Sequence, residues 1–185
     1  MASRRPAQPR VQPIPEALDK ARELMKDSVV PAYNVTATLA HNELVGKGVG
    51  RFARALLFKG TVSPRQRELV ILRMGFNCQA VYEFGQHTLF GLDAGLTDEE
   101  IYAVTRPLST YQWSEEDRIL LQMTDDLYTD DVVSDATWAE LTAHWSTSDV
   151  LEFAAAALCY RVVSGLLNTC GVQLDEGVPG WPEKP

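Results

Sequence analysis

Apolar residues recur at helical spacing along most of the chain. Between residues 15 and 27, Leu18, Ala21, Leu24 and Met25 fall on one side of a helix, as expected for an amphipathic segment. No alternating apolar and polar run of useful length is bounded by hairpin turns, so very little strand is expected. The pattern therefore predicts an all-α protein of roughly eight or nine helices.

Capping residues place several helix boundaries. Ser63 precedes Pro64, with Gln66 three residues after the cap, which predicts a helix beginning at residue 64. Asn34 is expected to cap a helix over residues 34–45, with the chain loosened by the glycines that follow and a short helix over residues 52–58. Helices are also expected to start at Thr97, Ser114, Ser134 and Ser146, and to stop at Gly60, Gly95 and Gly171.

The proline and charge pattern divides the chain into three parts. Residues 1–14 carry several prolines and arginines without apolar periodicity, and are expected to form a flexible arm or a strap on a neighbouring subunit. Residues 15–175 are expected to form a single helical domain. Residues 176–185 read as a loop-like C-terminal tail. A chain of 185 residues is long enough for such a domain to bury a core.

Charge, cysteine content and apolar stretches indicate which binding partners and which cellular compartment to expect. The net charge of −8 argues against nucleic acid as a partner, because phosphate binding needs a basic surface. Cys78, Cys159 and Cys170 have no tight spacing and no secretory signal is visible, so thiols in a cytoplasmic protein are expected. The longest apolar stretch, residues 150–158, contains Glu152 and is too short to span a bilayer, so no membrane partner is expected.

Glu68, Glu83 and His87 are the best candidates for acid–base chemistry. Glu68 lies in one apolar-periodic segment, and Glu83 and His87 lie four residues apart in the next, so these two share a helix face. Two carboxylates and an imidazole in one pocket could transfer protons near neutral pH. The alternatives are a structural pairing of Glu68 with Arg65 or Arg73 and a helix-stabilising pair of Glu83 with His87.

Further residues are candidates for substrate binding. Gln86 could donate a hydrogen bond to a substrate carbonyl, whereas Tyr82 has packing as its alternative role. Tyr160, Ser164 and Asn168 form a polar stripe on the last helix, which would line a pocket or make hydrogen bonds across a subunit interface. Metal binding by the three acid–base candidates is a less favoured alternative, because nothing else supplies a ligand cluster. No metal is therefore expected.

Three stretches together resemble the carboxymuconolactone decarboxylase family, which shares its fold with the alkylhydroperoxidase-D-like proteins. PRQRELVILRMG resembles the family's helix with an essential glutamate, here Glu68. YEFGQHTLFGLDAGLTDEEI resembles the next helix, which carries the histidine, here His87, and the turn after it. CYRVVSGLLNTCGVQL resembles the closing helix. The resemblance implies an all-helical bundle and a homo-oligomer, usually a trimer or hexamer.

The chain departs from the peroxidase branch of that family at its redox pair. The branch needs Cys-x-x-Cys with a histidine four residues after the second cysteine, and these positions hold Ala80 and Glu83. Cys78 lies two residues before the first thiol position, so it cannot take part in the usual dithiol cycle. The resemblance therefore implies a site in which acid–base chemistry replaces thiol chemistry.

These observations predict a cofactor-free enzyme that acts on a small oxygenated molecule such as a lactone, an enol or a keto acid. The reaction would be a decarboxylation, isomerisation, hydration or cyclisation with Glu68, Glu83 and His87 as the acid–base groups. Two other hypotheses stay open. One is a thiol-dependent, peroxidase-like activity through Cys78, and the other is a non-catalytic oligomeric protein that binds a small ligand in the same cavity.

Overall fold

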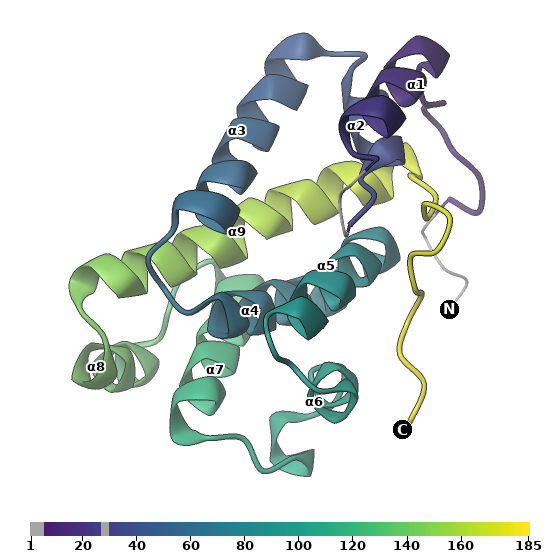
Figure 1. The fold of residues 1–185 in the computed structure, drawn as a ribbon. Helices are drawn as coiled ribbons and strands as arrows, with labels where there is room; N and C mark the ends of the chain where they lie inside the picture. The colour runs from purple at the N-terminus through teal and green to yellow at the C-terminus, as the bar shows by residue number, and fades with distance from the viewer. Residues whose placement is uncertain (1–5, 27–29) are drawn as a thin grey trace.

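The computed structural model describes residues 6–26 and 30–185, and helices account for all of the regular structure in these residues (Figure 1). This confirms the predicted all-α class. The α-helices are α1 (Pro15–Leu24), α2 (Tyr33–Leu39), α3 (Glu43–Lys59), α4 (Pro64–Asn77), α5 (Val81–Asp93), α6 (Asp98–Ala103), α7 (Glu115–Asp130), α8 (Asp135–His144) and α9 (Thr147–Cys170), with a short 3-10 turn η1 (Leu108–Thr110).

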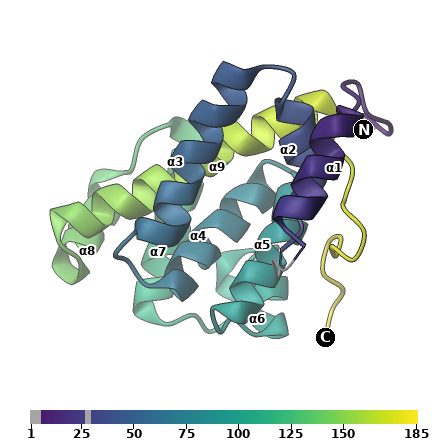
Figure 2. The same cartoon turned by 45° about the horizontal axis from the view of Figure 1, so that its top comes forward.

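Helices α4 and α9 form the centre of the bundle. Helix α4 is buried from residue 67 to residue 75 and packs against α5, α7 and α9. Helix α9 also contacts α3, α7 and α8, and it runs across the whole molecule in Figures 1 and 2. A helix that is apolar on most sides is expected at such a central position.

The length and composition of α9 would also allow it to cross a membrane. Half of its most apolar segment is buried inside the protein, where it packs against five other helices. A buried core helix has the same composition as a membrane span, so apolarity alone does not distinguish the two. The packing is that of a core helix.

Most predicted helix boundaries are confirmed. The Ser63 side chain accepts a hydrogen bond from the Gln66 backbone, and Thr97 and Ser146 each form a complete capping box. Helix α9 ends at Gly171, which has a φ of 70°, a conformation that glycine adopts without a Cβ clash.

The prediction for residues 34–58 was wrong. Asn34 lies inside α2, and the residue that caps the following helix is Asn42, whose side chain accepts from Val45 N. The three glycines did not interrupt the chain, because α3 continues through them and packs against α9. At Gly46 a Cβ would lie 2.9 Å from the Leu39 carbonyl oxygen, so the close approach of α2 requires glycine there.

The described part of the N-terminal arm and the C-terminal tail both pack on the helical domain. Residues 1–5 of the predicted arm lie outside the described residues. In the rest of the arm, the Arg10 and Val11 amides donate to the carbonyl oxygen of Cys170, at 2.8 and 3.1 Å, which places this segment at the end of α9.

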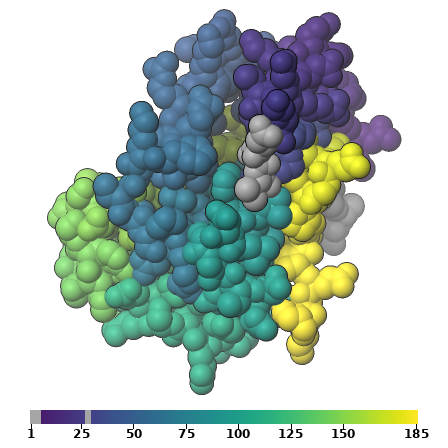
Figure 3. Space-filling view, viewed as in Figure 1, coloured from purple at the N-terminus to yellow at the C-terminus, as the bar shows by residue number. Residues whose placement is uncertain are grey.

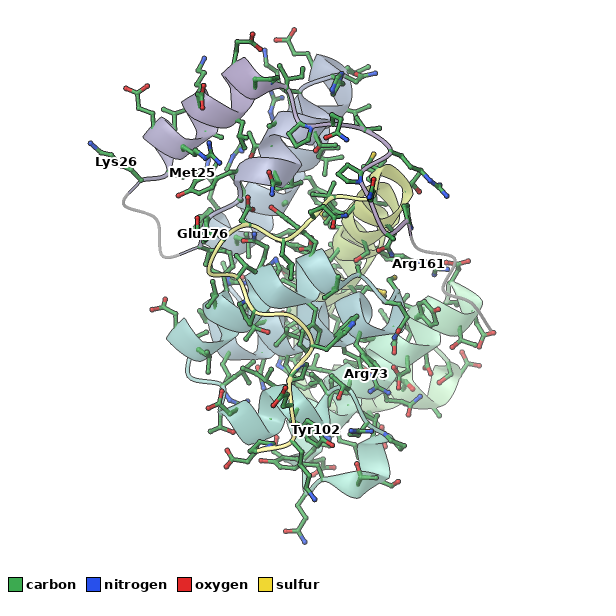
Figure 4. The ribbon with its side chains drawn as sticks, turned by 90° about the vertical axis from the view of Figure 1, so that its right-hand side faces the viewer. Met25, Lys26, Arg73, Tyr102, Arg161 and Glu176 are labelled. Atoms are coloured by element: carbon green, nitrogen blue, oxygen red, sulfur yellow. The ribbon has the colours of Figure 1, made fainter. Side chains whose placement is uncertain are left out.

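The predicted C-terminal tail has no helix and lies along α5, as Figures 3 and 4 show from two sides. The centroid of the Trp181 ring lies 5.0 Å from the centroid of the Phe84 ring. A Cβ on Gly85 would come within 2.1 Å of the Pro179 carbonyl oxygen, so only glycine at position 85 admits the tail. The tail therefore covers the side of α5 that carries Phe84 and Gly85.

Candidate functional site

The α4–α5 hairpin brings the three acid–base candidates together. Residues 78–80 connect the two helices, with Gln79 in the left-handed conformation at a φ of 53°. The chain then runs back along α4, so that Phe84 lies beside Gly75 and His87 beside Glu68. The spacing of four residues puts Glu83 on the same face as His87, one turn earlier.

His87 lies between two carboxylates. Its Nδ1 is 2.5 Å from Glu68 Oε2, and its Nε2 is 3.0 Å from Glu83 Oε1. All three side chains are buried, with Glu68 fully shielded from solvent. The predicted convergence of Glu68, Glu83 and His87 is therefore what the structure shows, whereas their catalytic role stays a prediction.

Glu68 also forms an ion pair with Arg67, the residue before it. The Arg67 Nε and Nη2 atoms lie 3.0 and 2.9 Å from Glu68 Oε1, so each carboxylate oxygen of Glu68 has a different partner. The alternative expectation, a structural pairing of Glu68 with Arg65 or Arg73, was wrong. Arg65 pairs with Asp117, and Arg73 pairs with Asp125. Consecutive helix residues do not share a face, so spacing gave no sign of Arg67; only its long side chain reaches the carboxylate.

The two carboxylates favour the protonated form of His87. Burial by itself would lower the pKa of the imidazole, but the nearby charges and hydrogen bonds of Glu68 and Glu83 outweigh it and raise the pKa to about 9. His87 is therefore an imidazolium at neutral pH. Its charge and that of Arg67 balance the charges of the two glutamates. We call these four residues (Arg67, Glu68, Glu83 and His87) the acid–base cluster.

The polar stripe on α9 faces the interior of the chain. The ring of Tyr160 meets the ring of His87 edge-on, with 4.5 Å between their centroids. Burial, followed by the charges of Glu83 and Glu68, raises the pKa of the Tyr160 phenol well above its ordinary value, so the phenol keeps its proton. Asn168 donates to the Cys78 carbonyl oxygen at 2.9 Å and Ser164 is fully buried. Of the three stripe residues, Tyr160 makes the ring contact with His87, and Asn168 instead bonds the connection between α4 and α5.

Tyr82 and Gln86 contact a different carboxylate, that of Asp175, which the sequence analysis did not identify. The Tyr82 hydroxyl donates to Asp175 Oδ2 at 2.5 Å, and Gln86 Nε2 donates to the same oxygen at 3.2 Å. The backbone N–H of Asn34 donates to Asp175 Oδ1 at 3.0 Å. We call these four residues the C-terminal clasp. In this structure the donor groups of Tyr82 and Gln86 bind Asp175. Their role in substrate binding stays a prediction.

The donor set of the acid–base cluster does not suit a metal ion. Both nitrogens of His87 already face carboxylates, which leaves no nitrogen to coordinate a cation. Among residues 6–26 and 30–185, no three His, Cys, Asp or Glu side chains form a group that could hold a metal.

The surroundings of Cys78 and Cys159 bear on the thiol hypothesis. The Cys78 sulfur lies 3.8 Å from the sulfur of Met74, at the end of α4. Burial and the charge of Glu83 raise the pKa of the Cys159 thiol to about 11, which disfavours its thiolate. No disulfide joins any of the three cysteines.

Two surface hollows of the described chain lie away from the cluster. One, of about 210 Å³, lies between residues 9–13, α2 and the end of α9. The other, of about 390 Å³, is lined by Thr88, Asp98, Ile101 and residues 179–185 of the tail. Neither is lined by Glu68, Glu83 or His87, whose side chains are buried in the described part of the chain.

Sequence and structure comparisons agree with the motifs. Residues 43–126 match the family model described as the carboxymuconolactone decarboxylase family, which confirms the predicted resemblance. The matched region contains the whole acid–base cluster. No curated protein matches the sequence.

Solved structures with the same fold have low sequence identity. An alkylhydroperoxidase AhpD core protein from Ralstonia eutropha, described as an uncharacterized peroxidase-related protein, is 18% identical with a TM-score of 0.75, covering 88% of this chain and 87% of its own. An uncharacterized peroxidase-related protein from Silicibacter sp. is 10% identical with a TM-score of 0.77, covering 99% and 100%. A variant of the debrominase Bmp8, in complex with 2,3,4-tribromopyrrole, is 12% identical with a TM-score of 0.74, covering 92% and 94%. These likenesses confirm the AhpD-like fold.

Proposed function

We propose that this chain, whose residues 43–126 match the carboxymuconolactone decarboxylase family, is a cofactor-free acid–base enzyme acting on a small oxygenated molecule. One observation carries the proposal: a buried imidazole has a carboxylate against each of its two nitrogens. A structural ion pair needs only one such contact. Two contacts give a proton a path from Nε2 of His87 to Oε1 of Glu83 across 3.0 Å.

The proposed proton transfer keeps the charges in the cluster small. When the Nε2 proton moves to Glu83, the imidazolium becomes a neutral imidazole and the carboxylate becomes a carboxylic acid. Glu68 keeps its hydrogen bond to Nδ1 throughout. The protonated Glu83 can then give its proton to an enolate carbon or oxygen of the substrate, and the reverse step removes one.

The substrate class follows from the resemblance to the family and from the proton chemistry of the cluster. Decarboxylation, isomerisation, hydration and cyclisation of a lactone, enol or keto acid all need a proton added or removed beside a carbonyl group. The complex of Bmp8 with 2,3,4-tribromopyrrole supports a small ring compound as a ligand for this fold. Because the side chains of the cluster are buried in the described part of the chain, the substrate reaches them by displacing the side chains around them.

We also propose that the protein acts as a homo-oligomer, a trimer or hexamer as in the family. Apolar side chains stand exposed on the outer face of α9 and on α3 beside it, among them Leu151, Val162 and Phe58, with exposed fractions of 61%, 57% and 67%. Such a patch is typical of a subunit interface. Native mass spectrometry of the wild type and of Val162→Glu tests this, and a monomeric wild type would contradict it.

The catalytic proposal is tested by screening lactones, enols and β-keto acids for turnover, followed by His87→Gln. This variant keeps the size of the side chain but cannot exchange a proton, so turnover should fall about 10²–10⁴-fold. His144→Gln is the matched control, since His144 lies on α8 and faces Glu115. Full turnover in His87→Gln would overturn the proposal.

The His87→Gln variant, together with alkylation of Cys78 and with Glu83→Gln, also tests the thiol-dependent and the binding-protein hypotheses. Turnover that is lost on alkylation of Cys78, and kept in His87→Gln, would indicate the thiol route. Saturable binding of a screened compound without product, kept in both His87→Gln and Glu83→Gln, would indicate a binding protein. What supports acid–base catalysis over the thiol route is that His87 contacts both Glu68 and Glu83, whereas the Cys78 sulfur lies beside the Met74 sulfur at the end of α4.

A further inference from the structure

The two carboxylates that face His87 differ in their own surroundings. Glu68 has a second cation, because Arg67 binds its Oε1 through two nitrogen atoms at 3.0 and 2.9 Å. Glu83 makes no ion pair other than that with His87 within the described chain. The arrangement is therefore asymmetric: one carboxylate is held by an arginine, and the other is held only by the imidazole.

The distances to the imidazole show the same asymmetry. Nδ1 lies 2.5 Å from Glu68, as in a strong charge-assisted hydrogen bond, whereas Nε2 lies 3.0 Å from Glu83. The groups that face His87 from α9 are Tyr160 and, near Glu83, Cys159, and burial raises the pKa of both, so both stay neutral. The charges that act on the imidazole are those of Glu68 and Glu83, and Arg67 is linked to it through its ion pair with Glu68.

We infer that Arg67 is a positioning residue that fixes the tautomer of His87, so that Nδ1 keeps its proton and Nε2 exchanges it with Glu83. The guanidinium stabilises the negative charge of Glu68, so this carboxylate accepts the hydrogen bond of Nδ1 without taking its proton. Glu83, which has no such arginine in the described chain, takes the proton of Nε2. The nitrogen that is protonated in a neutral histidine is set by the hydrogen bond at the other nitrogen. This inference rests on the proposed function, since it says which end of the cluster exchanges protons with the substrate.

A purely structural role for Arg67 predicts something different. An arginine that only anchors α4 would change the stability when it is replaced, and would leave the imidazole unaffected. A positioning residue changes which nitrogen carries the proton. The two roles are separated by a readout on the imidazole itself.

Nitrogen-15 NMR of the histidine rings gives that readout, and the chain has only three histidines to assign. His41→Gln and His144→Gln identify the signals of the other two. Above the pKa of His87, which is about 9, the wild type should show the tautomer with a proton on Nδ1. The tautomer with a proton on Nε2 would overturn the inference without any variant at Arg67.

Two variants at Arg67 then test the cause. In Arg67→Gln the Nε2-protonated tautomer should appear beside the first, and the titration midpoint of His87 should move upward, because a positive charge has been removed. Arg67→Lys should restore a single tautomer. Arg65→Gln is the matched control, because it removes an arginine of α4 that binds Asp117 instead of the cluster. An unchanged single Nδ1 tautomer in folded Arg67→Gln would contradict the inference.

Kinetic measurements distinguish a failure of this inference from a failure of the proposed function. With an active substrate, Arg67→Gln should lower kcat and move the pH profile upward, and Arg67→Lys should recover most of the loss. If no substrate is ever turned over, the proposed function fails, and the NMR tautomer still decides the role of Arg67. If turnover depends on His87 and the tautomer is unaffected by Arg67, only the present inference fails.

Discussion

Two buried clusters of carboxylates contact side chains of α5, and they differ in the groups that donate hydrogen bonds to those carboxylates. In the C-terminal clasp, the donors to Asp175 within the described residues are neutral: a phenol, an amide side chain and backbone N–H groups. In the acid–base cluster, Glu68 and Glu83 share a donor that titrates, the imidazole of His87, and Arg67 is a second donor to Glu68. The difference indicates that burial of a carboxylate does not by itself identify a site for proton transfer. What identifies it is a partner that can give up its proton.

The two clusters also connect different parts of the chain. The acid–base cluster joins neighbouring helices of one hairpin, with Glu68 and His87 19 residues apart. The clasp joins Asp175 to Tyr82, 93 residues away, and to Asn34, 141 residues away. The clasp therefore ties the tail and α2 to α5, and its loss should affect global stability more than chemistry.

The largest expected contrast comes from the same chemical change in each cluster. Glu83→Gln replaces a carboxylate that exchanges protons, so kcat should fall about 10²-fold or more. Asp175→Asn replaces a carboxylate that only accepts hydrogen bonds, and kcat should change by less than about threefold. Both are measured with a substrate from the screen, after circular dichroism shows that the variants are folded. Equal losses of kcat would remove the distinction between the clusters.

The next effect is the pH dependence of stability. The pKa of His87 is raised from 6.5 to about 9 on folding, so His87 should stabilise the protein fully below pH 6.5 and lose this contribution as the pH rises through 9. The raised pKa corresponds to about 3 kcal/mol. Urea unfolding from pH 6 to 10 measures the free energy of unfolding. His87→Gln should lack this dependence, and an equal slope in that variant would contradict the assignment.

The acid–base cluster was predictable from the sequence because its parts are local. Glu83 and His87 are four residues apart on one helix, and Glu68 lies in the preceding helix of the same hairpin. Helical spacing and the resemblance to the family were enough to predict that these three converge. Arg67 was missed because adjacent helix residues face different directions.

The clasp was not predictable, because nothing local marks Asp175 as buried. It lies outside any helix, beside a tail of glycines and prolines, and its partners come from distant segments. The helix boundary near residue 40 was missed for a related reason. Both Asn34 and Asn42 are good caps, and the packing of α2 decides which one is used.

A smaller effect is expected from removing the acceptor of the clasp. Asp175→Ala leaves the buried Tyr82 hydroxyl without its acceptor, while the Gln86 amide keeps the Pro31 carbonyl oxygen, and this should lower the free energy of unfolding by about 2 kcal/mol. Asp175→Asn should cost less, because its carbonyl oxygen still accepts. Burial raises the pKa of Asp175, so replacing it with a neutral isostere relieves a desolvation cost. Urea unfolding at pH 7 compares the two variants, and an equal loss in both would contradict this reasoning.

The smallest effect tests whether the clusters are independent. Tyr82→Phe removes the hydroxyl that donates to Asp175, so its effect should overlap with that of Asp175→Ala, with a coupling energy of about 1 kcal/mol in a double-mutant cycle. Tyr82 and Glu68 share no hydrogen-bond partner in the described chain, so Tyr82→Phe and Glu68→Gln should add to within about 0.5 kcal/mol. Both cycles use the free energy of unfolding at one pH. Coupling across the two clusters as large as that within the clasp would mean that α5 transmits changes from the tail to His87, and the two clusters would then be one network.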